Sequence, residues 1–229
     1  MSDYVFSRVA PRPELRFSQL EQFTRLDPYG QHQAVWQLCE LPLRQVHGPT
    51  AFLFRHEWHG DLPVLYVLSH NVPVDRLGLW HIQSKPYAPQ LAVGDRLHFT
   101  LRANPVVTRN GKRHDVVMDA KQQMQWQHMP PEARPALNAL AYDAGTAWLT
   151  GRATQHGFAL VADSLLVDGY RTHTMRRRGV APIHVSTLDF SGVLSVTDPA
   201  RCVQTLYEGL GHAKGFGCGL LLVKRVSTW

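Results

Sequence analysis

A tyrosine and a histidine three residues apart, Tyr29 and His32, are the clearest candidates in the sequence for proton-transfer chemistry. Asp27 and Pro28 precede them, a combination typical of a helix start, and a spacing of three places both rings on one helical face. Histidine can act as a general acid or base near neutral pH, and a helix start offers N–H groups to a phosphate. A second interpretation stays open, in which His32 is a core residue packed beside Trp36.

A glycine-rich segment near the C-terminus, residues 209–219, runs into an apolar stretch that predicts a buried strand. Backbone N–H groups in such a loop can face an anion, and Lys214 adds a positive charge. The segment is not a phosphate-binding P-loop, because Lys214 is followed by Gly215 rather than by Ser or Thr and a helix. A tight turn that only allows close packing is the alternative. The residues expected to contact a phosphate-bearing partner are Gly211, His212, Lys214, Gly215 and Gly217.

The densest basic run lies within residues 170–182 and contains Arg171, Arg176, Arg177 and Arg178. We expect it to form a loop between two strands. Arginines there would suit the phosphate backbone of RNA, because a guanidinium can bind two phosphate oxygens at once. A solvated loop without a partner is the alternative.

Composition narrows the class of protein. The 229 residues carry a net charge of +6 and a pI near 9.5, which favours a polyanionic partner such as nucleic acid. Three widely spaced cysteines suit a reducing cytosol and show no metal-binding spacing. No apolar run approaches the ~20 residues of a membrane helix, and no signal peptide is evident. We therefore expect a cytoplasmic protein with no membrane partner, no metal and no cofactor.

The neighbouring histidines His56 and His59 do not form the zinc-protease pattern, which needs two residues between the glutamate and the second histidine. They lie on a predicted strand and point to opposite faces. We assign them no function.

Hydrophobic periodicity predicts the order strand, helix, strand, strand, helix, strand twice along the chain. This order is typical of a split βαβ, or ferredoxin-like, unit. In the first half, two β-rich runs over residues 51–58 and 64–69 with Gly60 between them predict a hairpin. The sequence therefore predicts an α+β protein of two tandem ferredoxin-like (RRM-like) domains, residues 1–88 and 95–229. Residues 84–94, which contain two prolines and a glycine, are the expected linker.

In the second half we expect one long strand over residues 96–108 and a return strand over 113–118. A mainly helical segment over 131–156 and a strand over 158–167 should follow. The chain then continues with a strand over 185–196, a helix over 200–210 that Asp198 and Pro199 begin, and the last strand.

Several blocks of sequence resemble the CasE family, the repeat-processing endoribonucleases of type I-E CRISPR systems. The blocks are Ser7-Arg8-Val9; Tyr29-Gly30-Gln31-His32 with Trp36; Leu101-Arg102-Ala103-Asn104-Pro105 with Gly111-Lys112-Arg113; Trp148-Leu149 with Gly157-Phe158; Phe190-Ser191-Gly192-Val193-Leu194 with Thr197-Asp198-Pro199; and the segment from Gly209 to Leu221. One departure is Gly215, where related sequences more often carry Ala or Ser.

The resemblance implies metal-independent cleavage of the repeat hairpin in precursor CRISPR RNA. It places the family's catalytic histidine and tyrosine on His32 and Tyr29. It also implies that the product stays bound and that the protein joins the other Cascade subunits. Arg102, Lys112 and Arg113 are further candidates for RNA contact. A non-catalytic RNA clamp and a metalloenzyme remain as alternatives.

Overall fold

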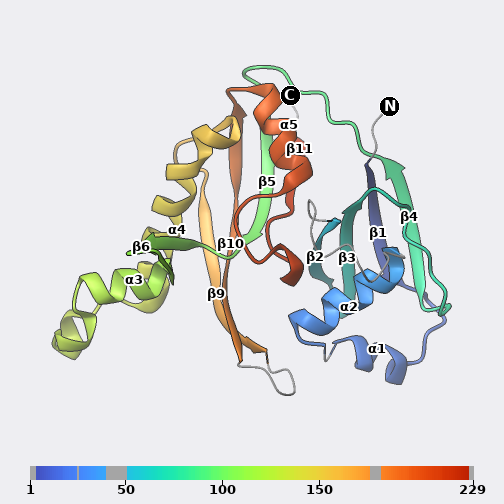
Figure 1. Cartoon of the computed structure of the whole chain (residues 1–229), viewed down its shortest axis with the longest axis horizontal. Helices are drawn as coiled ribbons and strands as arrows, with labels where there is room; N and C mark the ends of the chain where they lie inside the picture. The colour runs from blue at the N-terminus through green and yellow to red at the C-terminus, as the bar shows by residue number, and fades with distance from the viewer. Residues whose placement is uncertain (1–3, 25, 40–50, 176–181, 227–229) are drawn as a thin grey trace.

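The computed structural model describes residues 4–24, 26–39, 51–175 and 182–226. These residues form two large antiparallel sheets that lie side by side, each with helices packed against it, and a third sheet of two strands (Figure 1). We call residues up to 86 the first half and residues from 96 onward the second half. The mixed helix and strand content confirms the predicted α+β class.

The sheet of the first half has the strand order β2-β3-β1-β4, and all its neighbouring strands are antiparallel. Its strands are β1 (Val5–Pro11), β2 (Phe52–His59), β3 (Leu62–Ser69) and β4 (Trp80–Pro86), and its helices are α1 (Phe17–Thr24) and α2 (Pro28–Cys39). Apolar side chains from both helices and all four strands form one core, which includes Phe23, Val35, Phe54 and Trp80. The predicted hairpin around Gly60 is confirmed as the β2–β3 turn.

The sheet of the second half has the order β11-β5-β10-β8, and β9 also pairs with β10. Its strands are β5 (Arg96–Ala103), β8 (Phe158–Leu160), β9 (Leu166–Met175), β10 (Ile183–Val196) and β11 (Leu221–Arg225). The helices α4 (Leu137–Ala153) and α5 (Pro199–Glu208) share its core, which contains Leu101, Trp148 and Phe190. Asp198 caps α5 by accepting a hydrogen bond from the N–H of Arg201, which confirms the predicted helix start.

Two predicted strands of the second half are shorter than expected. The strand over 96–108 is divided into β5 and β6 (Val106–Arg109), because Pro105 between them has no N–H to donate to a ladder. The return strand over 113–118 is β7 (Lys112–Asp115) only. Asp115 accepts a hydrogen bond from the N–H of Met118 and begins α3 (Val116–Gln123) instead. The β6–β7 hairpin and α3 form the arm that projects at the left of Figure 1.

The segment expected to be mainly helical over 131–156 is confirmed, with 3-10 turns over 131–133 and 154–156 and α4 between them. Two other expectations for the second half need correction. The strand expected over 158–167 is two strands, β8 and β9, with residues 161–165 between them. The loop expected to carry the basic run is partly strand, since β9 extends to Met175 and includes Arg171.

The two halves share an apolar cluster. Leu53 and Leu68 of the first sheet pack with Leu220, and several aromatic residues surround them. The rings of Tyr4 and Tyr207 stack with their centroids 4.4 Å apart. Close to this cluster, the guanidinium of Arg102 donates to the backbone oxygen of His56 at 3.1 Å. These contacts hold the end of β2 and the start of α2 close to the glycine-rich segment.

Candidate active site

His32 lies where the two halves meet. It projects from α2 with its ring centroid 5.4 Å from that of Phe52 and 5.7 Å from that of Trp36. A Cβ built on Gly215 would lie 3.6 Å from its Nδ1 atom, so the histidine from the start of the chain touches the turn near its end. The expected packing of His32 beside Trp36 is therefore present, and the same ring also lies beside the glycine-rich segment.

The two ring nitrogens of His32 have different surroundings. Nδ1 is buried and has no hydrogen-bond partner among the described residues. Nε2 is the nitrogen left to exchange a proton with a substrate. Burial lowers the pKa of His32 below its usual value of 6.5, so the ring is neutral at pH 7 and can accept a proton.

Tyr29 lies one helical turn before His32 on α2 and is half-buried. The side-chain amide of Gln33 donates a hydrogen bond to its Oη atom at 3.3 Å. The predicted spacing on one helical face is therefore present, and the phenol and the imidazole lie at the same end of α2.

The start of α2 is less suited to a phosphate than the sequence indicated. The Asp27 carboxylate accepts a hydrogen bond from the N–H of Gly30 at 2.8 Å, and the Asp27 backbone oxygen accepts from Gln31. Pro28 has no N–H to offer. A carboxylate therefore occupies the position where a phosphate was expected, and attraction by the helix start adds little.

The glycine-rich segment is folded as a compact turn. Residues Lys214–Phe216 form a 3-10 turn, η4, bounded by left-handed residues at Ala213 and Gly217. The N–H groups of Phe216, Gly217 and Gly219 donate to backbone oxygens of the protein itself. These three N–H groups are thus used internally. Charge on the Lys214 side chain, rather than the row of N–H groups, is the stronger feature for binding an anion.

Positive charge gathers around His212, which pairs with Asn104 in an isolated bridge between the loop and the end of β5. Burial lowers the pKa of His212, and the charges of Arg113, Arg152 and Lys214 lower it further. Arg113 and Lys214 were predicted, but Arg152 was not. The guanidinium of Arg152 lies 4.6 Å from the ring centroid of Trp148 and donates to the backbone oxygen of Val106. Its position one helical turn after Trp148 was the available signal.

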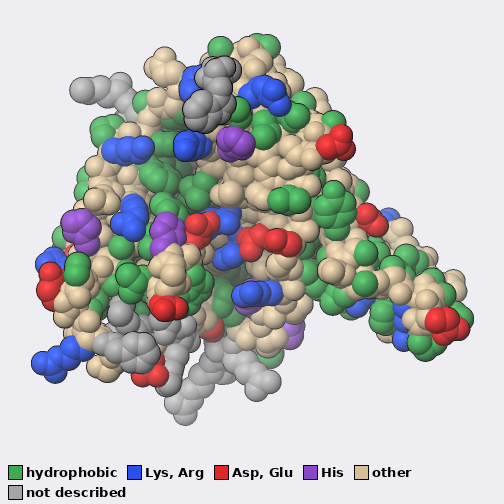
Figure 2. Space-filling model, turned by 180° about the vertical axis from the view of Figure 1, so that it is seen from behind, with side chains coloured by type: hydrophobic (Ala, Val, Ile, Leu, Met, Phe, Trp, Pro, Cys, Tyr) green, Lys and Arg blue, Asp and Glu red, His purple; other side chains and the backbone are tan. Residues whose placement is uncertain are grey.

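The other predicted cations are distributed differently. Arg102 makes two 2.8 Å hydrogen bonds to the Asp189 carboxylate, so its guanidinium is largely committed within the protein. Arg171 lies exposed on β9, and Lys112 lies exposed on β7. Arg176, Arg177 and Arg178 lie outside the described residues. On the face of the molecule that Figure 2 shows, Lys and Arg side chains are scattered among acidic and apolar ones rather than collected in one patch.

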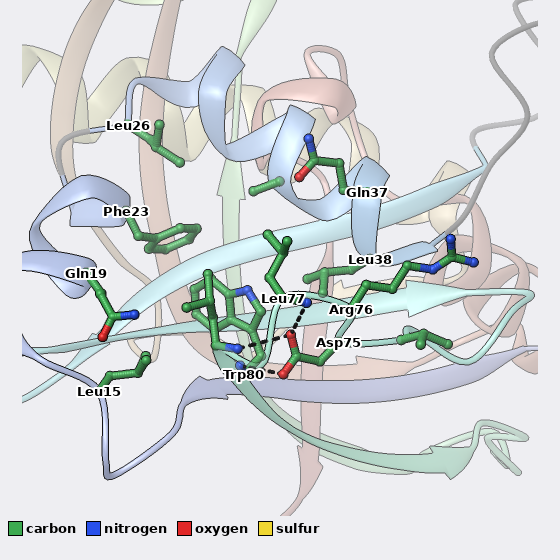
Figure 3. A pocket seen from close by; sticks show the side chains of 13 residues that line it. Leu15, Gln19, Phe23, Leu26, Gln37, Leu38, Asp75, Arg76, Leu77 and Trp80 are labelled. Atoms are coloured by element: carbon green, nitrogen blue, oxygen red, sulfur yellow. Dashed lines mark hydrogen bonds between the residues drawn. The ribbon is translucent and has the colours of Figure 1, made fainter.

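Two cavities flank the site. One, of about 480 Å³, lies between the halves and is lined by the start of α2, the end of β2, strand β9 and the η4 turn. A larger one, of about 830 Å³, lies within the first half and is mostly apolar (Figure 3). Phe23, Leu38 and Trp80 line it, and neither Tyr29 nor His32 lines either cavity. In Figure 3, Asp75 accepts hydrogen bonds from the backbone beside this larger cavity.

Among the described residues, no three His, Cys, Asp or Glu side chains lie close enough together to hold a metal ion. Within the same ranges, no helix is long and apolar enough to cross a membrane.

The chain is similar in sequence to known proteins. The family model described as CRISPR associated protein matches residues 6–225. The CRISPR-associated endoribonuclease Cse3 of Thermus thermophilus is 30% identical over 214 residues, which cover 86% of this chain and 90% of the relative. The Cascade subunit CasE of Escherichia coli is 30% identical over 199 residues, which cover 85% and 90% of the two chains.

Solved structures agree with these sequence matches. The structure of Thermus thermophilus Cse3 bound to an RNA representing a pre-cleavage complex has a TM-score of 0.72 at 25% identity, covering 98% of this chain and 100% of that one. Cse3 bound to a 19-nucleotide RNA has a TM-score of 0.71 at 26% identity, covering 96% and 98%. The chain therefore belongs to the CasE (Cse3) family of CRISPR-associated proteins.

Proposed function

We propose that this protein is the endoribonuclease that cleaves the repeat hairpin of precursor CRISPR RNA. In this proposal it then remains on the 3′ hairpin as a subunit of Cascade in the cytoplasm. Its relatives support the proposal, because one is named an endoribonuclease and the other a Cascade subunit. The observation that carries it is the position of His32 beside Gly215, which brings a proton-transfer group of the first half against the glycine-rich segment of the second half.

The proposed chemistry is attack of a ribose 2′-oxygen on the adjacent phosphorus. The 2′-hydroxyl gives up its proton, the new oxygen–phosphorus bond forms, and the bond to the 5′-oxygen breaks. The products are a 2′,3′-cyclic phosphate and a 5′-hydroxyl, which receives a proton. This reaction needs no metal, and general acid–base catalysis typically contributes about 10²–10⁴-fold.

His32 is the proposed proton-transfer group, and the base role suits it better than the acid role. A ring that burial keeps neutral at pH 7 can accept the 2′-hydroxyl proton through Nε2. Tyr29, at the same end of α2, is proposed to orient the scissile phosphate through its hydroxyl. Lys214 would oppose the extra negative charge of the pentacovalent phosphorane.

The rest of the RNA would be held by cations of the second half. Arg113, Arg152 and Lys214 surround His212, and Lys112 and Arg171 lie exposed on β7 and β9. Arg176, Arg177 and Arg178 are proposed to extend this surface on sequence grounds alone. Arg102 is proposed to support the site through Asp189 rather than to bind phosphate directly.

We also propose that each half is a ferredoxin-like domain, with residues 1–88 and 95–229 as their bounds. In support, each sheet has its first and third strands at the centre and its second and fourth strands at the edges. In the second half, β8 and β9 together occupy the place of the second strand. The first half departs from the pattern, because no helix lies between β3 and β4 in the described residues.

The test is cleavage of an end-labelled repeat hairpin in excess EDTA. The proposal predicts a single cut with a cyclic or 3′ phosphate on the 5′ fragment. Binding without cleavage would instead support a non-catalytic RNA clamp. Cleavage that EDTA abolishes and Mg²⁺ or Zn²⁺ restores would support a metalloenzyme.

A further inference from the structure

The cleft between the two halves has a size and lining that suit one nucleotide. Its volume of about 480 Å³ lies within the range of small-ligand sites and is far too small for a duplex. Trp58 lies at the exposed end of β2 with 51% of its surface accessible. Arg171, Thr172 and His173 line the other side, so an aromatic surface faces hydrogen-bonding and cationic groups.

The cleft lies beside the candidate active site, although neither Tyr29 nor His32 lines it. Phe216 and Gly217 line it, and the neighbouring Gly215 packs against His32. Gln31, which also lines it, precedes His32 on α2. A nucleotide in the cleft would therefore be next to the phosphate that His32 reaches.

His56, which also lines the cleft, has an unused hydrogen-bond donor. The Gln31 side-chain nitrogen donates to the backbone oxygen of Leu26 at 3.3 Å, which fixes the orientation of its amide. The same nitrogen lies 3.2 Å from Nδ1 of His56, so Nδ1 accepts and the neutral ring carries its proton on Nε2. Only 9% of His56 is accessible, and Nε2 has no hydrogen-bond partner among the described residues. A buried donor of this kind favours a ligand that brings an acceptor.

We propose that this cleft binds one unpaired nucleotide of the RNA, adjacent to the cleaved phosphate. Its base stacks on Trp58, an acceptor on its edge faces His56, and its phosphate lies toward Arg171. Stacking on an aromatic side chain is the usual way in which proteins hold unpaired bases, and it tolerates different bases. The cleft thus positions the RNA strand for His32. This inference rests on the proposed function.

The experiment uses hairpins in which each nucleotide flanking the cleaved phosphate is replaced, one at a time, by an abasic nucleotide. Single-turnover cleavage is measured with wild-type protein, Trp58→Ala, Trp58→Phe and the neighbouring exposed control His59→Ala. We expect one abasic position to slow the wild type and His59→Ala about tenfold. Trp58→Ala should already cleave the unmodified hairpin slowly. The abasic nucleotide at the sensitive position should slow this variant by no more than about twofold more. Trp58→Phe should recover most of the sensitivity, because it keeps a stacking surface.

Equal cleavage of all abasic hairpins by the wild type would overturn the inference, as would equal sensitivity of Trp58→Ala and wild type. The same hairpins are also titrated against His32→Ala and the His32→Ala/Trp58→Ala pair in a binding assay. If the wild type cleaves nothing, the proposed function fails. An abasic effect on binding that depends on Trp58 would then still support the cleft as a nucleotide site.

Discussion

At the scale of single residues, His32 combines two roles that the sequence offered as alternatives. Its ring packs among Phe52, Phe54 and Trp36, as a core histidine would. Of its two ring nitrogens, only Nδ1 is buried without a hydrogen-bond partner among the described residues, and Nε2 is not. Packing therefore fixes the ring and selects the nitrogen that can meet a substrate.

The first prediction concerns His32→Ala. The substitution removes the proposed base, so single-turnover cleavage of the repeat hairpin in EDTA should fall by at least about 100-fold. Hairpin affinity should change less than about threefold, because the binding charges lie on Lys214, Arg113 and other residues of the second half. A gel-shift titration and circular dichroism check binding and folding. If the folded variant cleaved as fast as the wild type, His32 would have only a structural role.

Tyr29→Phe is the matched change on the same helical face. It keeps the aromatic ring and removes only the hydroxyl that would orient the phosphate. Cleavage should slow by about tenfold, less than for His32→Ala, with the thermal midpoint unchanged within about 2 °C. A loss as large as that of His32→Ala would give Tyr29 a direct part in proton transfer.

At the scale of elements, the glycine-rich turn permits a prediction with an internal control. A Cβ on Gly215 would make ordinary contacts of 3.6 and 3.7 Å with His32, whereas Gly217 has φ of +77° and its Cβ would lie 3.3 Å from Phe54. Gly215→Ala should therefore fold and cleave within about threefold of wild type. Gly217→Ala should lose about 1–2 kcal/mol of stability from its left-handed conformation alone.

Urea unfolding and single-turnover cleavage of both variants check this difference. Equal stability of the two variants would mean that the turn relaxes freely around Gly217.

The basic run at the end of β9 is also an element-scale feature. Replacing Arg176, Arg177 and Arg178 with Gln should weaken hairpin binding and reduce the slope of log K against log salt by about 1 for each lost phosphate contact. The control replaces three exposed cations elsewhere, Lys85, Arg96 and Lys224, which gives the same change in net charge. If both triple variants reduced the slope of log K against log salt equally, the effect would come from net charge rather than from phosphate contacts of Arg176, Arg177 and Arg178.

At the scale of the whole molecule, local signals in the sequence predicted most elements of the first half. The Asp27-Pro28 helix start and the Gly60 turn act over a few residues, and both occur as predicted. Predictions in the second half were wrong where neighbouring signals compete. Pro105 interrupts a run that alternates like one strand, and the Asp115 side chain ends a strand by capping a helix.

The site could be predicted only in part, because its contacts join distant segments. The rule that places Tyr29 and His32 on one helical face is local, but the contact of His32 with Gly215 depends on how the halves pack. For the same reason, the pairing of Arg102 with Asp189 had no local signal. The helical spacing of Arg152 from Trp148 indicated contact between these two side chains but not the position of Arg152 beside the loop. The resemblance to the CasE family indicated that His32 is catalytic. Physical reasoning from the sequence left a choice between proton transfer and a position in the core.

Stability should depend on pH through His56. Burial, with a smaller effect of the Arg102 charge, lowers the pKa of His56 from 6.5 to about 4. The unfolded chain therefore binds a proton between pH 6.5 and 4 that the folded protein does not, and the free energy of unfolding falls as the pH falls through this range. The contribution of His56 is on the order of 3 kcal/mol.

Urea unfolding at several pH values from 7 to 4.5 measures this dependence. His56→Phe, which cannot take up a proton, should flatten the decline, and the exposed control His59→Ala should not. An equally steep decline in His56→Phe would assign the dependence to the other buried histidines.

The last prediction concerns the connection between the halves. Residues 87–95 form no helix or strand, and Val93 is 72% exposed, so a specific protease site inserted there should be cut in the folded protein. The sequence alone predicts that the two fragments keep their structure. The structure adds that they should stay together, because Leu53, Leu68 and Leu220 form a shared apolar cluster and Arg102 bridges to the backbone of β2.

The cut protein should therefore elute as one species on size exclusion and separate only in urea. Leu53→Ala should lower the urea concentration of separation, since removing a buried Leu side chain costs about 2–5 kcal/mol. Exposed Leu62→Ala on the same hairpin serves as the control. The cut protein should cleave RNA only while its two fragments stay associated, because His32 and Lys214 lie on different fragments. Two fragments that separate without urea and keep full activity when mixed at low concentration would contradict this account of the site.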